Sequence, residues 1–153
     1  SLKLAYSEEE FSVPDNLYII GLMNTADRSL AIMDYALRRR FSFVPIEPAF
    51  NNVVFLETFK NLFDKDYTSL IKIIEDINLD IKSDPSLGEG FEIGHSYFLP
   101  NLKGRKGNIS DIEEIINYDI LPLLKEYWYD DKDKYNNWQN ILNNQLKVLN
   151  DKR

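Results

Sequence analysis

Cysteine is absent from this sequence of 153 residues, and His95 is its single histidine. The absence of cysteine excludes a disulfide framework, a thiol nucleophile and any zinc site with cysteine ligands. One histidine likewise excludes a metal site that needs several imidazoles. No apolar run approaches the roughly 18 residues of a membrane-spanning helix, and no signal peptide opens the sequence. We therefore expect a cytoplasmic protein with no membrane partner.

Basic residues are outnumbered by acidic ones, 18 to 25, which gives a formal charge of -7. A chain with this net negative charge is not attracted to nucleic acid by its overall charge. Binding to nucleic acid would therefore need a local basic patch or a partner protein. Hydrophobic residues make up 44% and charged residues 28%, a composition typical of globular domains. The sequence begins with Ser1 rather than methionine, and we expect it to be part of a longer protein.

The first recognisable unit is a strand, a helix and a second strand. Residues 16–24 are a short apolar run without polar alternation, which predicts a strand covered on both faces, as in a parallel sheet. A helical pattern follows up to residue 37, and residues 41–46 predict the second strand. Two parallel strands and one helix cannot cover themselves. We therefore expect residues 1–48 to be the trailing piece of a larger α/β domain.

From residue 49 onward the patterns are helical. Helices are predicted over residues 50–63 and 67–81, from a capping-box pattern at Ser110, and over residues 133–149. Turn residues occupy 84–90, residues 91–99 suggest an extended segment or hairpin, and Pro122 should kink or split its helix. The predicted fold is thus α+β and mostly α, with residues 49–153 forming a helical subdomain. Trp128 and Trp138 are expected to anchor its core or an interface.

Arginine is concentrated in one short span, since four of the six arginines lie between Arg28 and Arg40. The Arg38–Arg40 run suits phosphate or a partner, because guanidinium is a rigid and permanently charged fork. The alternative interpretation is that the run complements the dipole of the preceding helix, although a single arginine would be enough for that. Asn24, at the carboxyl end of the predicted strand, could hold a water or a phosphate oxygen, or be an ordinary turn residue. The basic loop 103–107 could contact DNA or a partner, or be simply solvated.

Four blocks of this sequence resemble the McrB family, the AAA+ GTPase subunits of modification-dependent restriction systems. They are residues 20–29 (Ile-Gly-Leu-Met-Asn-Thr-Ala-Asp-Arg-Ser), 34–43 (Asp-Tyr-Ala-Leu-Arg-Arg-Arg-Phe-Ser-Phe), 87–98 (Leu-Gly-Glu-Gly-Phe-Glu-Ile-Gly-His-Ser-Tyr-Phe) and 120–131 (Ile-Leu-Pro-Leu-Leu-Lys-Glu-Tyr-Trp-Tyr-Asp-Asp). The blocks occur in the family's order and cover nearly the whole chain. The family's phosphate loop and acidic Walker B motif are not found in this sequence and are expected upstream. The resemblance implies the end of the AAA+ α/β subdomain followed by the helical lid.

The resemblance also implies roles for individual residues. Asn24 matches the sensor that orients the attacking water beside the γ-phosphate. Asp27 closes a candidate guanine motif, but a sensor or subunit-contact role is preferred for it, because the end of this strand lies near the γ-phosphate and far from the base; Arg28 lies beside it in the same nucleotide-binding block. Asp34, Arg39 and Arg40 match the region that faces the neighbouring subunit's nucleotide, with Arg39 preferred over Arg40 as the arginine finger.

Two further residues receive roles from the same comparison. Arg38 belongs to the same run and is either a further candidate for the finger or a structural residue. His95 lies where AAA+ lids often carry a second sensor, and a hydrogen-bonded structural histidine is its alternative.

At the level of function, the resemblance implies a hexameric motor that binds and hydrolyses Mg-GTP and drives an McrC-like endonuclease along DNA. Modified cytosine would be recognised by an upstream domain. The 153-residue chain alone is expected to be inactive and to bind no nucleotide or metal tightly. Two alternatives are a non-catalytic helical adaptor whose arginines grip an acidic partner, and an ATP-using AAA+ relative of the MoxR type. An upstream phosphate loop would separate motor from adaptor.

Overall fold

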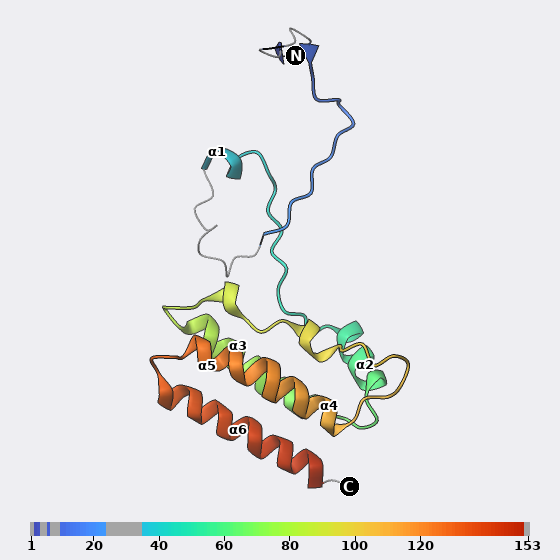
Figure 1. Cartoon of the computed structure of the whole chain (residues 1–153), viewed down its shortest axis with the longest axis vertical. Helices are drawn as coiled ribbons and strands as arrows, with labels where there is room; N and C mark the ends of the chain where they lie inside the picture. Colours follow the sequence, from blue (N-terminus) through green and yellow to red (C-terminus); the bar gives the residue numbers. More distant parts are fainter. Residues whose placement is uncertain (1, 4–5, 7–9, 24–34, 152–153) are drawn as a thin grey trace.

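The computed structural model describes residues 2–3, 6, 10–23 and 35–151, and most of its regular structure is helical (Figure 1). Two short strands, β1 (Leu2–Lys3) and β2 (Glu10–Phe11), pair antiparallel near the N-terminus. The helices and turns are, in chain order, α1 (Tyr35–Arg38), α2 (Val53–Leu62), α3 (Thr68–Ser83), η1 (Glu89–Phe91), η2 (His95–Phe98), α4 (Ile109–Glu114), η3 (Ile115–Ile120), α5 (Leu121–Tyr127) and α6 (Lys132–Asp151). The predicted mostly helical class is therefore confirmed. Among the described helices, none has the length and apolarity needed to cross a membrane.

Helix α3 lies at the centre of the helical part. Its apolar side chains recur at helical spacing, so that one stripe from Leu70 to Ile81 is buried. Helix α6 covers this stripe from one side and also contacts α4 and α5, and Figure 1 shows it running alongside them as the outermost helix. Leu142, Leu146 and Leu149 are the side chains of α6 that enter the core.

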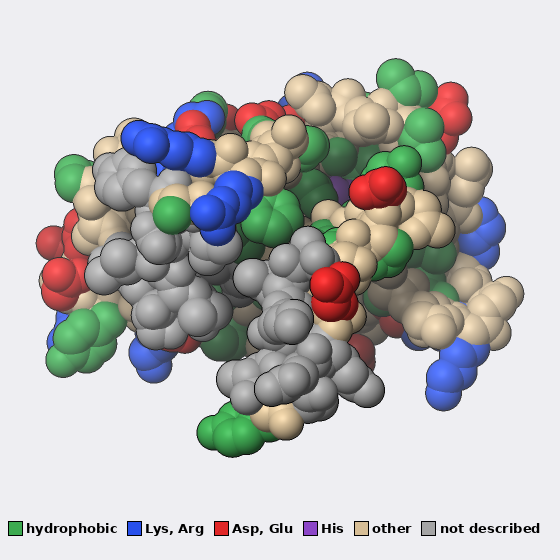
Figure 2. Space-filling view, turned by 90° about the horizontal axis from the view of Figure 1, so that it is seen from above, with side chains coloured by type: hydrophobic (Ala, Val, Ile, Leu, Met, Phe, Trp, Pro, Cys, Tyr) green, Lys and Arg blue, Asp and Glu red, His purple; other side chains and the backbone are tan. Residues whose placement is uncertain are grey.

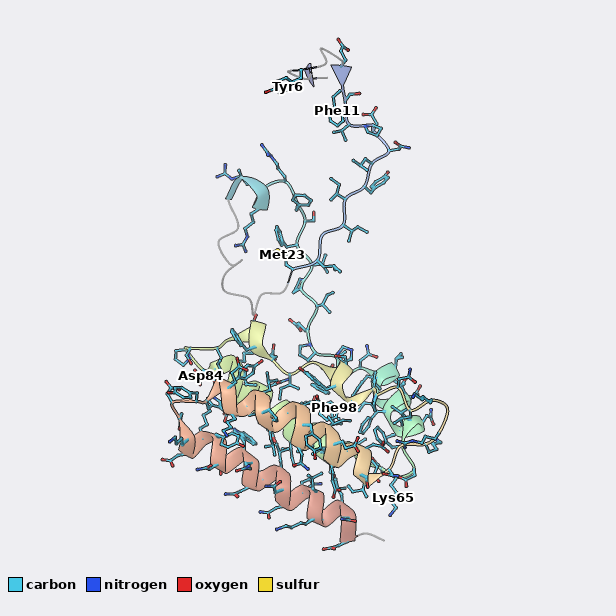
Figure 3. The ribbon with its side chains drawn as sticks, viewed as in Figure 1. Tyr6, Phe11, Met23, Lys65, Asp84 and Phe98 are labelled. Carbon is cyan, nitrogen blue, oxygen red and sulfur yellow. The ribbon has the colours of Figure 1, made fainter. Side chains whose placement is uncertain are left out.

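Aromatic residues build the end of the core beneath α2. Phe55 and Phe59, one turn apart on α2, are both buried, and the rings of Phe59 and Phe63 lie 5.0 Å apart. Phe98 of η2 packs against Phe59, and it lies inside the helical part in Figure 3. Helix α2 begins at Asn52, whose side chain accepts a hydrogen bond from the Val54 amide at 2.8 Å and so caps the helix.

Helices α4, η3 and α5 form one uninterrupted rod. The predicted capping box at Ser110 is wrong, because Asn108 is the N-cap and Asp111 completes the capping box with it. Pro122 neither breaks nor splits the rod. Proline has no N–H, and its ring would collide with the carbonyl four residues earlier in a regular α-helix. The turn before it is a π-helix, in which the Leu121 amide donates to the Ile116 carbonyl five residues back, and this wider turn accommodates the ring.

Two other predictions need correction. Residues 91–99 form neither a hairpin nor a strand but the two 3-10 turns η1 and η2. The predicted strands at residues 16–24 and 41–46 are not formed where the structure describes them. Their side chains are exposed, with Ile20 and Leu22 each at 90% and Ile46 at 85%. A parallel strand needs hydrogen-bonded neighbours and apolar cover on both faces, and these side chains have no such cover in the described part of the chain.

Candidate functional site

The arginine run lies where α1 ends. The guanidinium of Arg38 lies over the ring of Phe43, 5.8 Å from its centroid, which is a cation–π contact within the segment. Arg39 and Arg40 follow the helix and are exposed. Arg38 therefore has an intramolecular contact, whereas the next two guanidinium groups face solvent. A permanently charged fork that is exposed in this way can bind a phosphate or a carboxylate.

The other residues predicted for the nucleotide site are Asn24, Asp27, Arg28 and Asp34, and all four lie outside the described residues. Their arrangement around Arg39 and Arg40 stays a prediction. Within the described part of the chain, no three His, Cys, Asp or Glu side chains gather where they could hold a metal ion.

His95 lies in the helical part, on the turn η2. Its Nδ1 accepts a hydrogen bond from the backbone amide of Ala49 at 3.1 Å. The imidazole stands edge-on to the rings of Phe50 and Phe55, at centroid distances of 6.4 and 5.7 Å. Figure 2 shows this imidazole recessed among hydrophobic side chains. The structure therefore gives His95 a definite intramolecular role, whereas a contact with nucleotide stays a prediction.

The basic loop 103–107 uses two of its three cations to hold itself in place. The Arg105 guanidinium makes a two-pronged ion pair with Asp111, in which Nη1 donates at 2.8 Å. The Lys106 ammonium donates to the Asn61 carbonyl near the end of α2. The pKa of Asp111 is lowered to about 2, mainly by Arg105 and to a smaller extent by the hydrogen bond from the Asn108 amide. These contacts support the interpretation of a structural loop rather than a nucleic-acid contact.

Two tryptophans fasten the C-terminal helices to α3: Trp138 lies on α6, and Trp128 is the C-cap of α5. Trp138 donates from Nε1 to Asp80 at 2.9 Å, and Trp128 donates to Asp84 at 3.1 Å. The Lys134 ammonium also reaches Asp84, at 3.3 Å, and lies over the Trp128 ring. Figure 3 places Asp84 at one end of the helical part. The pKa of Asp84 is well below its usual range, first because of Ser86 and then because of Trp128 and Lys134.

Asn78 is a structural residue that the sequence patterns did not single out. It is the one buried polar side chain among the described residues, at 5% exposure. Its amide group donates to the Ile93 carbonyl at 3.0 Å, and its oxygen accepts from the Ile93 amide at 2.7 Å. This reciprocal pair fixes the segment that leads into η2 against α3. The available signal was a polar residue inside the apolar stripe of α3, which indicates a buried hydrogen bond.

These contacts define a class of structure: a small α-helical domain entered through a short linker, with an arginine run ahead of it. Residues 69–136 match the family described as McrB, alpha-helical lid domain. The chain is also 48% identical over 149 residues to the type IV methyl-directed restriction enzyme EcoKMcrB subunit of Escherichia coli (strain K12). That alignment covers 93% of this chain, and the chain spans about a third (32%) of the length of that relative. Residues 69–136 thus form a helical lid of the McrB type, and the similarity to an McrB subunit extends over most of this chain.

Proposed function

We propose that this chain is the C-terminal part of a GTP-hydrolysing AAA+ motor that serves a modification-dependent restriction system. The similarity to the E. coli subunit along 93% of the chain is the observation that carries this proposal. The phosphate loop and the magnesium ligands belong to an upstream part of the intact protein. The intact protein forms a hexameric ring in the cytoplasm, binds DNA through a further upstream domain and drives an McrC-like endonuclease to modified cytosines.

The residues ahead of the lid act on the γ-phosphate. The Asn24 amide orients the attacking water, while Asp27 and Arg28 lie in the same nucleotide-binding block. Arg39, with Arg40 as the second candidate, stabilises the charge that develops on the transferred phosphoryl group of the neighbouring subunit, and Asp34 lies in the region that faces that nucleotide. The exposure of Arg39 and Arg40 and the engagement of Arg38 with Phe43 support this division of roles.

Magnesium, when bound, neutralises phosphate charge and orients the transferred group. In the described part of the chain no cluster of acidic or imidazole groups fits a metal ion, and the magnesium ligands are placed upstream. The work of this chain in the reaction is to orient water and to supply positive charge across a subunit boundary.

Mixing two inactive forms of the intact protein tests the proposal. One form carries Arg39→Ala with a sound phosphate loop, and the other carries a defective phosphate loop with a sound Arg39. If the finger acts across the boundary, mixed rings contain some sites with both parts intact, and GTPase activity reappears. Fingers contribute about 10³–10⁵ in rate, so partial recovery is measurable. Arg38→Ala is the matched control from the same run and should retain most activity.

The outcomes separate the alternatives. If mixed rings with Arg39→Ala show no GTPase activity while mixed rings with Arg40→Ala regain it, the finger is assigned to Arg40. Silence for both, with co-assembly demonstrated, would refute a trans-acting finger in this run. Hydrolysis of ATP in place of GTP would favour the MoxR-type alternative. An intact protein that binds neither nucleotide would favour the adaptor alternative.

A further inference from the structure

The chain enters the helical part through a linker, residues 47–49. In Figure 1 the segment that follows α1 reaches the helical part beside the turn η2. Both backbone polar groups of Ala49 are bonded there. Its amide donates to His95 Nδ1 at 3.1 Å, and its carbonyl accepts from the Asn52 amide at 3.1 Å. The bond to His95 joins residues 46 positions apart, so it fastens the linker to a distant part of the lid.

The imidazole that receives this bond is itself held firmly. It packs edge-on against both Phe50 and Phe55, with interplanar angles of 85° and 81°, and these two side chains are only 3% and 5% exposed. Phe98, on the same turn, is fully buried against Phe50. Because Nδ1 accepts a hydrogen bond, the proton of the neutral ring lies on Nε2. The acceptor is thus fixed in position and in tautomer.

Among the described residues, no hydrogen bond or ion pair ties Glu47 or Pro48 to the lid. Glu47 is exposed, and its charge raises the pKa of Lys82 and of Glu92, in each case as a smaller effect than other causes. Lys82 already forms an ion pair with Glu89 at 2.8 Å. Glu47 therefore lies near one carboxylate of like charge, that of Glu92, and near the Lys82 ammonium, which is already paired with Glu89. Of the linker residues, all of which the structure describes, Ala49 is thus the one that is hydrogen-bonded to the lid.

We infer that His95 is a positioning residue: its neutral imidazole fastens Ala49 and thereby fixes the angle at which the lid is carried by the preceding nucleotide-binding part. This inference rests on the proposed function for its catalytic consequence, but the fastening itself does not. A lid that is set at one angle holds the nucleotide site in its hydrolytic arrangement, so loosening should reduce kcat more than it weakens nucleotide binding.

Three substitutions separate the hydrogen bond from the ring. In His95→Asn an acceptor oxygen occupies nearly the place of Nδ1, whereas in His95→Gln it is displaced by one methylene. His95→Phe keeps a ring and removes the acceptor. The first measurement is hydrogen exchange of the Ala49 amide by NMR on this chain. Protection should persist in wild type and His95→Asn, and exchange should be about five- to tenfold faster in the other two, the factor expected from one lost hydrogen bond.

The second measurement is Mg-GTP turnover of the intact protein. We expect a severalfold loss of kcat with nearly unchanged KM in His95→Gln and His95→Phe, and rescue in His95→Asn. Equal Ala49 exchange in all four proteins, or equal kcat when the exchange differs, would overturn the inference. An intact protein with no GTPase activity in wild type would instead refute the proposed function, and the exchange measurement would still decide whether His95 fastens the linker. Far-UV circular dichroism establishes that each variant is folded, and either His95→Gln or His95→Phe suffices for the test.

Discussion

Replacing Asn78 tests whether a single buried amide sets the stability of the lid. In Asn78→Leu an apolar side chain of similar size takes its place, and the amide and carbonyl of Ile93 lose their partners. Ile93 is 1% exposed, so neither group can turn to solvent without a local rearrangement. An unsatisfied buried polar group costs about 1–3 kcal/mol. Two such groups, offset by about 0.5 kcal/mol for the better helix propensity of leucine, predict a loss of about 2–5 kcal/mol.

Asn78→Ala should be destabilising to a similar or greater degree, because it adds a cavity to the two lost hydrogen bonds. The assay is urea unfolding followed by far-UV circular dichroism, with the slope of the transition compared between variants. Asn140→Ala, at an exposed position of α6, is the matched control and should gain up to about 0.7 kcal/mol from helix propensity alone. An Asn78→Leu variant as stable as wild type would refute the reasoning, because the apolar volume is retained there and only the hydrogen bonds are lost.

Three further predictions concern a tightly packed glycine and two side chains whose pKa is shifted. Gly107→Ala should cost about 1–3 kcal/mol in urea unfolding, because its Cβ would lie 2.5 Å from a core phenylalanine ring, whereas Gly94→Ala meets only a hydroxyl at 3.6 Å and should be near neutral; equal stability of the two would contradict this. Arg105 lowers the Asp111 pKa from 3.8 to about 2, so Asp111→Asn should destabilise the fold above about pH 4 and lose this effect as the pH falls through about 2. A difference in unfolding free energy between wild type and variant that does not change with pH in urea unfolding would argue against the ion pair. Burial raises the Tyr67 pKa from 10.0 to about 12, so wild type should lose stability relative to Tyr67→Phe as the pH rises from 10 through 12, and parallel alkaline denaturation curves would contradict this.

The sequence predicted those parts of the fold that depend on local periodicity. The apolar stripe of α3 and the long C-terminal helix α6 follow directly from side-chain spacing. The N-cap of α4 was misplaced by two residues because Asn108 and Ser110 are both good caps, and only Asn108 is also placed to complete the box with Asp111. At Pro122 the composition indicates a break, but the choice between a break and a π turn depends on how the rod packs.

Long-range contacts were the least predictable. The bonds from Asn78 to Ile93 and from Ala49 to His95 join residues 15 and 46 positions apart, and no local pattern encodes such pairings. The predicted strands at residues 16–24 and 41–46 had the right composition, but a parallel sheet requires neighbours that are far away in sequence. Of the predicted site, only the Arg38–Arg40 run and His95 lie in the described residues. For His95 the sequence left two interpretations open. The hydrogen bond from the Ala49 amide and the contacts with two phenylalanine rings support the structural one.

The two tryptophans have a practical consequence, because Trp138 holds α6 against α3 and Trp128 holds the end of α5 against the C-cap of α3. Trp128 is 2% exposed, and each indole N–H donates to a carboxylate of α3 or of its C-cap. Detachment of α6 would break the bond from Trp138 to Asp80 and remove Lys134 from the Trp128 ring, whereas the bond from Trp128 to Asp84 does not involve α6. The fluorescence of Trp138 is therefore a built-in optical report on the release of the last helix, and a red shift in its emission that precedes the loss of helicity would mark that release as a separate step in unfolding.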